Sequence, residues 1–270
     1  MVSDWVIETE DLAVGYDDKL VLDGITVRIP RKKITCIIGG SGCGKSTLLR
    51  AFVGLAEPRR GSVRILDEDL LSLSEEARAE LFERVGLMFQ EGGLLNSLTV
   101  ADNLMVPVKA HTRLPDDVVE DLVRLKLGLV NLEDAADKLP GELSGGMKKR
   151  AGLARALMLD PEVLFCDEPS AGLDPTTQAD LDRLLCQMRD QLGLTLVVVT
   201  HEVESIKTIA DYVILLEDGK VGFDGSLDDA LESDNETLVG FFGRKPDEQK
   251  DRPSLEELMF FDGAPIGAAA

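Results

Sequence analysis

Residues 39–46 have the composition of a loop that holds phosphate groups. They read Gly-Gly-Ser-Gly-Cys-Gly-Lys-Ser and match the pattern G-x-x-x-x-G-K-[ST], between an apolar run and a helix-like segment. The glycines let backbone N–H groups converge on phosphate oxygens, and the following helix adds positive potential at its N-terminus. The pattern predicts Lys45 at the β- and γ-phosphates and Ser46 as a ligand of Mg²⁺. We expect a nucleotide to contact a run of consecutive residues: Gly39, Gly40, Ser41, Gly42, Cys43, Gly44, Lys45, Ser46 and Thr47.

Two carboxylates follow a second apolar run. Residues 163–166 read Val-Leu-Phe-Cys, and Asp167 and Glu168 come directly after them. An apolar strand that ends in this way places its carboxylates at the C-terminal edge of a parallel sheet, where open α/β folds bind their ligands. We predict that Asp167 holds Mg²⁺ through a water molecule and that Glu168 polarises the attacking water as a general base. The preceding apolar run and Pro169 disfavour the alternative, a solvated surface pair.

The apolar pattern locates the elements that must position these groups. Five short runs have the character of strands that are buried on both faces: residues 34–38, 85–89, 163–166, 196–200 and 212–216. The apolar side chains of one further segment recur at helical spacing: Leu181, Leu184, Leu185, Met188 and Leu192. Gly193 is expected to end that helix. The alternation of strands and helices predicts a doubly wound α/β fold.

Three segments depart from this alternation. Residues 6–12 and 25–29 alternate like half-exposed antiparallel strands. Residues 91–157 are helical in pattern, with three prolines as punctuation, and predict a helical lobe inserted into the core. We expect one domain over residues 3–243 and a tail over residues 244–270. An amphipathic stretch in the tail, residues 254–261, is compatible with a cover for the core or with a docking segment for a second subunit or an accessory protein.

Composition limits the classes of function. The formal net charge of −21 in 270 residues argues against nucleic-acid binding, and it suggests that membrane contact runs through a protein partner. No apolar run approaches the roughly 20 residues that span a bilayer, and the N-terminus does not resemble a signal peptide. The cysteines at 36, 43, 166 and 186 have no CxxC spacing, which is typical of reduced thiols in the cytoplasm.

Taken together, the motifs resemble those of ATP-binding cassette (ABC) ATPases over residues 3–243. The resemblance implies an ABC-type P-loop NTPase fold: a RecA-like parallel sheet core, an N-terminal antiparallel β subdomain and an inserted helical subdomain. It implies that Tyr16 stacks on adenine. Gln90 matches the Q-loop, which touches Mg²⁺ and the attacking water and responds to the membrane partner. His201, which follows Leu-Val-Val-Val-Thr, matches the switch histidine that contacts the γ-phosphate.

The segment Leu-Ser-Gly-Gly before the second apolar run resembles the ABC signature. The resemblance implies that Ser144, Gly145 and Gly146 face the γ-phosphate of ATP bound to the other subunit, and that Asp174 lies in the D-loop, which crosses the dimer interface. The chain is thereby expected to hydrolyse ATP as a homodimer that binds two ATP molecules with Mg²⁺. A separate integral-membrane permease would be its partner.

The signature departs from the common pattern at one position. Met147 stands where the family usually has Gln, so the polar contact of that Gln is not carried over, and Lys-Lys-Arg follows. This variant resembles the MlaF-like ATPases of MCE-associated phospholipid transport. It implies a MlaE-like permease, a STAS-domain accessory protein (MlaB-like), an MCE-domain protein (MlaD-like) and a place on the inner face of the cytoplasmic membrane.

Two alternatives to phospholipid transport remain open at this stage. The first is a lipoprotein-release or small-solute ABC transporter, because the cassette does not touch the cargo. The second is a soluble ABC ATPase of chromosomes, DNA repair or translation. The short distance between phosphate loop and signature, the single cassette and the acidic charge disfavour this second class.

Overall fold

The computed structural model describes residues 3–17 and 19–243 of the 270-residue chain. It divides into two compact units, Met1–Ser233 and Asp234–Ala270. The described part of the second unit contains one helix, α9 (Glu236–Phe242), whose first N–H groups are capped by the side chain of Asn235. The tail over residues 244–270, including the predicted amphipathic stretch, lies outside the described residues. The domain boundaries drawn from the sequence therefore stay a prediction.

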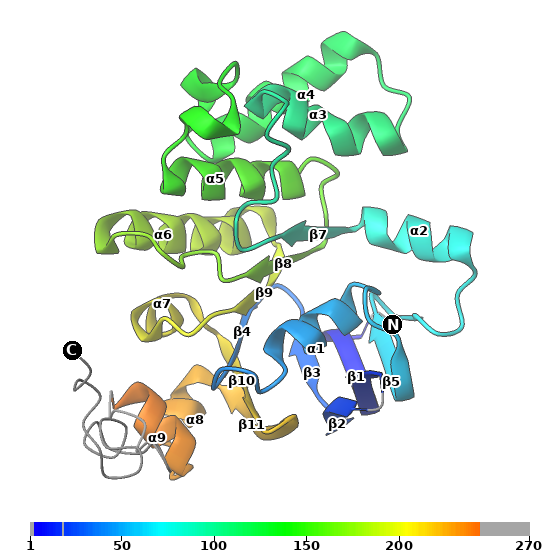
Figure 1. The fold of residues 1–270 in the computed structure, drawn as a ribbon, viewed down its shortest axis with the longest axis vertical. Helices are drawn as coiled ribbons and strands as arrows, with labels where there is room; N and C mark the ends of the chain where they lie inside the picture. The colour runs from blue at the N-terminus through cyan, green and yellow to red at the C-terminus, as the bar shows by residue number, and fades with distance from the viewer. Residues whose placement is uncertain (1–2, 18, 244–270) are drawn as a thin grey trace, which may run out of the picture. The chain divides into compact units, whose positions relative to one another are not determined.

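A mostly parallel sheet forms the core of the first unit (Figure 1). Its strands are β4 (Ile34–Gly39), β7 (Val85–Met88), β8 (Val163–Asp167), β9 (Thr195–Val199), β10 (Tyr212–Glu217) and β11 (Lys220–Ser226). The order is β11-β10-β4-β9-β8-β7, and only β11 pairs antiparallel to its neighbour. All five apolar runs of the sequence are strands of this sheet. They are continuous rather than alternating because helices cover both faces.

Five helices accompany the strands of this sheet. They are α1 (Lys45–Phe52), α2 (Glu75–Glu83), α6 (Pro175–Leu192), α7 (Val203–Ile209) and α8 (Leu227–Glu232). The predicted apolar face of α6 is buried except near its end, and the helix stops at Gly193, which is left-handed with φ 65°. Phe52 of α1 packs on Phe165 of β8, with ring centroids 6.0 Å apart. This contact fixes the helix after the phosphate loop against the strand that carries the carboxylates.

A second, antiparallel sheet is built from the N-terminal segment. It contains β1 (Trp5–Tyr16), β2 (Lys19–Ile25), β3 (Arg28–Pro30), β5 (Pro58–Ile65) and β6 (Glu68–Asp69). The single strand predicted over residues 25–29 is wrong, because the ladder is interrupted between β2 and β3. The hydroxyl of Thr9 donates to Ile25 O at 3.1 Å and accepts from Val27 N at 3.1 Å. A side chain thus satisfies the backbone groups that a continuous strand would pair.

Three helices lie between β7 and β8 in the chain: α3 (Val100–His111), α4 (Asp116–Leu129) and α5 (Gly145–Ala156), with short 3₁₀ turns at Glu133–Ala135 and Pro140–Glu142. Figure 1 shows them together on the side of the parallel sheet away from the antiparallel sheet. Fully buried Asn103 holds the loop that leads into α3, since its amide donates to three carbonyls and its oxygen accepts from Leu95 N at 2.7 Å. Within the described residues, no helix has the length and apolar character needed to cross a membrane.

Candidate functional site

The predicted phosphate loop connects β4 to α1. Gly39 and Gly44 have φ angles of 143° and 108°, a region that side chains rarely adopt. A Cβ at Gly39 would lie 2.3 Å from Leu216 O, and one at Gly44 would lie 2.5 Å from Leu22 Cδ2. Both positions therefore require glycine. The loop can follow its tight path only because these two residues have no side chain.

The side chain of Lys45 folds back over this loop. Its ammonium group donates to Gly39 O at 2.9 Å and to Gly40 O at 2.8 Å, and it lies 3.9 Å from the sulfur of Cys43. The helix N-cap is Gly44, which has no side chain with which to cap the first turn. The first N–H groups of α1 and the lysine are thus the donors that an anion would meet at this helix end.

Tyr16, the predicted adenine contact, lies at the end of β1 and is 45% exposed. A side-chain hydrogen bond with Arg50 lowers the pKa of Tyr16, and a second one with Thr47 acts in the same direction. The ring is therefore held against the helix that follows the phosphate loop. It is available at the surface for a flat partner to stack on.

Asp167 ends β8 on the same side of the sheet. Burial raises the pKa of Asp167, and the neighbouring carboxylate of Glu168 raises it further, whereas Arg50, Lys149 and Lys45 oppose the shift. The three cations surround a carboxylate that would otherwise be costly to keep ionised. Lys45 is among them, so the phosphate loop and the carboxylate strand converge on one site.

The same residues fit a magnesium ion that arrives with phosphate groups. Among the described residues, no three His, Cys, Asp or Glu side chains form a cluster that could hold a metal alone. Mg²⁺ is normally held by one or two carboxylates together with substrate phosphates and waters. Half-buried Asp167 and the exposed hydroxyl of Ser46, at the start of α1, supply the hard oxygen donors of such a site. Gln90, the third predicted ligand, is exposed directly beyond β7.

Glu168 and His201 form a pair at the end of the sheet. Glu168 Oε1 lies 2.9 Å from His201 Nδ1. Because a carboxylate only accepts, the network assigns the proton to Nδ1 and leaves Nε2 directed elsewhere, 3.5 Å from Glu202 Oε1. The histidine ring is 59% exposed, so it can meet a ligand. The pair thus combines an oriented imidazole with a carboxylate.

The second oxygen of Glu168 is the chemically distinctive atom of the site. Oε2 is buried and has no hydrogen-bond partner among the described residues. The backbone of Glu168 is left-handed, with φ 49°, which costs about 1–3 kcal/mol in a residue with a side chain. Its N–H donates to Val199 O at 2.8 Å. A strained, anchored carboxylate with one unsatisfied oxygen is suited to accept a proton from a water molecule.

The signature segment begins α5. Ser144 is the N-cap, and its hydroxyl accepts from Met147 N at 3.3 Å. A Cβ at Gly146 would lie 2.5 Å from Thr177 Cγ2, so the start of α6 packs closely on the signature. Asp174 caps α6, and its hydrogen bonds with Thr177 lower the pKa of the Asp174 carboxyl. In Figure 1, α5 and α1 lie apart, with β7 and β8 between them, so the signature does not face the phosphate loop of its own chain.

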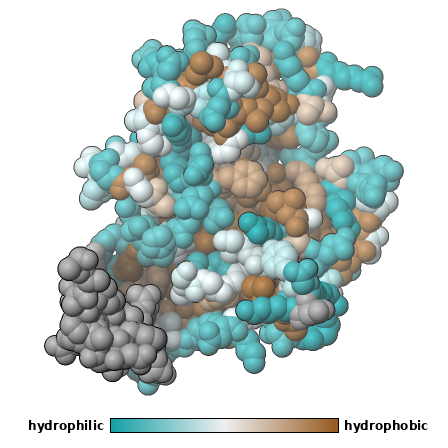
Figure 2. All heavy atoms as spheres, viewed as in Figure 1, coloured by the Kyte–Doolittle hydropathy of each residue, from teal (hydrophilic) through white to brown (hydrophobic). Residues whose placement is uncertain are grey.

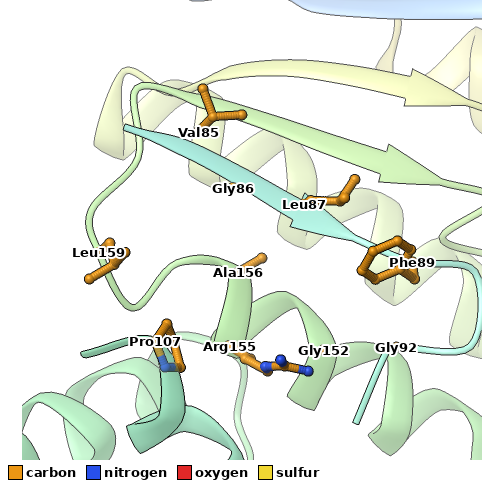
Figure 3. Close-up of a pocket in the computed structure, with 10 residues that line it drawn as sticks. All are labelled: Val85, Gly86, Leu87, Phe89, Gly92, Pro107, Gly152, Arg155, Ala156 and Leu159. Atoms are coloured by element: carbon orange, nitrogen blue, oxygen red, sulfur yellow. The ribbon is translucent and has the colours of Figure 1, made fainter. Parts of the chain in front are cut away.

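A groove lies between β7 and the helices α3 and α5. Its volume is about 170 Å³, and its lining residues are Val85, Gly86, Leu87, Phe89, Gly92, Pro107, Gly152, Arg155, Ala156 and Leu159. Figure 3 shows the ring of Phe89 at the end of β7, with Pro107 and Arg155 reaching in from the two helices. Phe89 is 50% exposed, and Figure 2 shows apolar surface at the height of β7. Burial lowers the pKa of Arg155, whose side chain donates to Gly93 O.

Sequence reasoning missed two basic residues of the site. Arg50 contacts Tyr16 and lies close enough to Asp167 to influence its pKa. Lys149 is buried, although it sits in a Lys-Lys-Arg run that looks solvated, and it donates to Gln90 O and Glu168 O. Its burial could have been suspected from helical spacing, because Gly152 and Leu153 follow at i+3 and i+4 and are also buried.

A buried carboxyl group supports the helix that follows His201. Ser205 of α7 donates to Asp182 Oδ2 at 2.7 Å, and Gln178 of α6 donates to Ser205 Oγ at 2.8 Å. Asp182 is 3% exposed, and its Oδ1 has no hydrogen-bond partner among the described residues. Burial raises the pKa of Asp182, and Glu202 raises it further, against the hydrogen bond from Ser205. This network ties α6, the helix that follows the predicted D-loop, to α7.

Replacing Asp182 by asparagine should change how stability depends on pH. As pH rises above the ordinary carboxyl pKa of 3.8, the unfolded chain releases the proton while folded Asp182 keeps it, so the wild type loses stability until the folded pKa is passed. The variant lacks this loss. Its free energy of unfolding relative to wild type should therefore rise as the pH is raised above 3.8, which urea titrations at a series of pH values would measure. A relative stability that stays flat or falls would show that Asp182 is ionised in the fold.

Comparison with known proteins shows which family has these features. The sequence model of the family described as ABC transporter matches residues 22–171. The chain is 36% identical over 242 residues to the intermembrane phospholipid transport system ATP-binding protein MlaF of Haemophilus influenzae, which covers 90% of this chain and 92% of that protein. It is also 36% identical over 257 residues to the probable ribonucleotide transport ATP-binding protein mkl of Mycobacterium leprae, which covers 93% of this chain and 74% of that protein.

A solved structure shares the fold. It is a dimeric, post-hydrolysis state of the ATP-binding cassette MJ0796 bound to ADP and Pi. The TM-score is 0.75 at 27% sequence identity, over 82% of this chain and 98% of the cassette. The α/β architecture predicted from the sequence is confirmed by this likeness and by the family match.

Proposed function

The chain belongs to the ABC transporter family, as an ATP-hydrolysing subunit, and on this premise we propose that two copies drive phospholipid movement through a separate membrane permease. Two findings together support the proposal: the groups present in the site and the function for which a similar protein is named. The site has the groups for ATP hydrolysis. The Haemophilus influenzae relative, which matches over nearly its whole length, is named for phospholipid transport.

ATP binding would begin at the phosphate loop. Tyr16 would stack on adenine, and Lys45 would exchange its bonds with Gly39 O and Gly40 O for bonds with the β- and γ-phosphates. Ser46, Asp167 and Gln90 would hold Mg²⁺, which when bound neutralises charge on the phosphates. Most of the catalysis would come from positioning and from stabilisation of charge, as in other phosphoryl transfers.

Hydrolysis would use the Glu168–His201 pair. The unpartnered Oε2 of Glu168 would accept the proton of the attacking water, while Oε1 remains on His201 Nδ1. With a proton on Nε2 as well, the exposed ring of His201 would donate to the γ-phosphate. Each oxygen of the carboxylate thus has one task. The histidine orients the base through one nitrogen and the substrate through the other.

The second subunit would complete each site. Ser144, Gly145 and Gly146 start α5, where backbone N–H groups favour an anion, and α5 lies apart from α1 in Figure 1. A signature that cannot reach its own phosphate loop is suited to the loop of a second copy. The solved cassette with this fold is itself dimeric. Asp174, which caps α6 beside the signature, would lie at the interface.

The groove beside β7 is the proposed contact with the permease. Its lining residues Phe89 and Gly92 flank Gln90 in the sequence, so a segment inserted there would move the loop that is predicted to touch Mg²⁺ and the attacking water. Its apolar lining, including half-exposed Phe89, suits a helix with an apolar face. We place the dimer on the inner face of the cytoplasmic membrane. A MlaE-like permease, an MCE-domain protein and a STAS-domain protein would complete the assembly.

Ribonucleotide transport is the second candidate, because a relative of equal identity is named for it. The Met147-Lys-Lys-Arg variant of the signature favours phospholipid transport.

Co-purification distinguishes phospholipid transport from the alternatives. The tagged chain is recovered from its native membranes with mild detergent, and its partners are identified by mass spectrometry. An MCE-domain protein, a MlaE-like permease and a STAS-domain protein are expected. A solute-binding protein or a lipoprotein-release permease in their place would reject the phospholipid assignment.

The purified complex then allows transport to be measured. In proteoliposomes with fluorescent phospholipid, ATP should stimulate lipid movement. The matched control is the same complex with Glu168→Gln, which should assemble but not transport, because turnover and not assembly depends on that carboxylate. ATP hydrolysis that is stimulated by a ribonucleotide gradient, without any lipid movement, would support the second candidate.

A further inference from the structure

We propose that Lys149 is a positioning residue of the hydrolytic site, which ties the backbone of Glu168 to that of Gln90 so that the general base and the Q-loop move as one unit. This inference rests on the proposed hydrolysis mechanism. It adds a residue that the signature motif does not assign. Lys149 is the fifth residue of α5, the helix that begins with the signature, and this helix places it in the site.

The contacts of Lys149 join two loops that are distant in sequence. Its ammonium group donates to Glu168 O at 2.8 Å and to Gln90 O. The side chain is 6% exposed, so water does not compete for these bonds. Both acceptors are backbone carbonyls. The contact therefore fixes the paths of the two loops rather than the side chains that act in them.

The environment explains why a cation is kept in this position. Burial lowers the pKa of Lys149, and the carboxylates of Glu168 and Asp167 act against that shift. A buried ammonium group is costly unless charges and hydrogen bonds compensate it, and here both are present. Removing the ammonium would take away the donor that Gln90 O has among the described residues, and it would leave Glu168 O with the N–H of Ala171 at 3.3 Å. The site depends on this one side chain for both connections.

Glu168 needs such support because its backbone is left-handed, with φ 49°. Its N–H donates to Val199 O, and its carbonyl accepts from Lys149 at 2.8 Å and, over a longer distance of 3.3 Å, from the N–H of Ala171. The carboxylate is then aimed at His201 through Oε1. If the carbonyl were released, the backbone could relax toward an ordinary conformation and carry Oε2 away from the water. Lys149 touches no reacting group itself, so it acts through Glu168.

Neighbouring Lys148 provides a matched control. It lies on the same helix with the same charge, and both lysines line a cleft that also contains Gln90 and Gly145, but Lys148 is more exposed than Lys149. Lys148→Met and Lys149→Met change the net charge of the helix by the same amount. Only Lys149→Met removes the bridge between the two loops.

The test compares steady-state ATP hydrolysis by the purified full chain and its variants. In Lys149→Met, kcat should fall by about 10- to 100-fold, because a small misplacement of a catalytic group has effects of this size. The KM and the Kd for ATP should stay within about threefold, since the phosphate loop is untouched. Lys149→Gln keeps N–H donors without the charge and should regain part of kcat. Lys148→Met should resemble wild type.

Three results would overturn the proposal. The first is a Lys149→Met variant that turns over like Lys148→Met. The second is a Lys149→Gln variant no more active than Lys149→Met. The third is loss of ATP affinity in parallel with kcat, which indicates a general structural defect. Thermal unfolding is measured for each variant. If Lys149→Met does not fold, the turnover of Lys149→Gln is compared with that of Lys148→Gln instead. An inactive wild type would instead reject the hydrolysis mechanism itself.

Discussion

Replacing Glu168 by glutamine should abolish ATP turnover and leave ATP bound. The amide has the size of the carboxylate but cannot accept the proton of the attacking water, so kcat should fall by about 10²- to 10⁴-fold. The phosphate loop is unchanged, and its donors remain in place. With hydrolysis blocked, the two subunits should stay closed around ATP. Size-exclusion chromatography with light scattering should detect stable dimers in the presence of ATP and Mg²⁺.

The neighbouring carboxylate offers a control for this experiment. Glu202 lies 3.5 Å from the other ring nitrogen of His201, and its side chain is more exposed than that of Glu168. Glu202→Gln removes the same charge from the same histidine but leaves Oε2 of Glu168 in place. It should retain most of the turnover. A Glu168→Gln variant that binds ATP yet remains monomeric would contradict the sandwich dimer, whereas one with normal turnover would remove Glu168 from its role as base.

Replacing Lys45 by alanine should remove activity for a different reason. The ammonium group is positioned over the phosphate loop by Gly39 O and Gly40 O, and it is the one flexible cation within that loop. A charge-assisted hydrogen bond contributes about 1.5–3 kcal/mol, so ATP affinity should fall by about 10- to 150-fold. Turnover at ordinary ATP concentration should be lost with it. Binding of a fluorescent ATP analogue measures the affinity directly.

Lys207→Ala is the matched control for that loss. Lys207 is exposed on α7, so the substitution changes net charge equally without touching the loop. It should bind ATP as wild type does. Together the two variants separate the steps of the cycle, since Lys45→Ala should bind ATP weakly and Glu168→Gln should bind ATP and not release it. Normal turnover by Lys45→Ala would undo the assignment of residues 39–46 as the phosphate loop.

The sequence was informative where chemistry and local structure use neighbouring residues. The phosphate loop needs glycines beside a strand and a helix, and the structure places Gly39 and Gly44 in conformations that only glycine adopts readily. The buried parallel strands were visible because both of their faces are covered, which makes them continuously apolar. The end of α6 at Gly193 followed from the same kind of local rule.

Local patterns failed where a distant side chain intervened. The segment at residues 25–29 alternates like one strand, yet the hydroxyl of Thr9 takes the place of its ladder, and nothing within the segment reveals that. Lys148 and Lys149 are identical in type and adjacent in sequence. Only the packing of α5 against the loops after β7 and β8 makes one a half-exposed cation and the other a buried bridge.

The amino-acid sequence by itself thus predicted which groups would handle phosphate and water, because those groups are set by residue type at short, regular spacing. It also determined the class of fold that carries them. Tertiary structure alone decided how the groups are aimed: the left-handed backbone of Glu168, the pairing of its Oε1 with His201 and the bridge from Lys149. These features depend on contacts between segments that are far apart in the chain, and such contacts exist only once the core has closed around them.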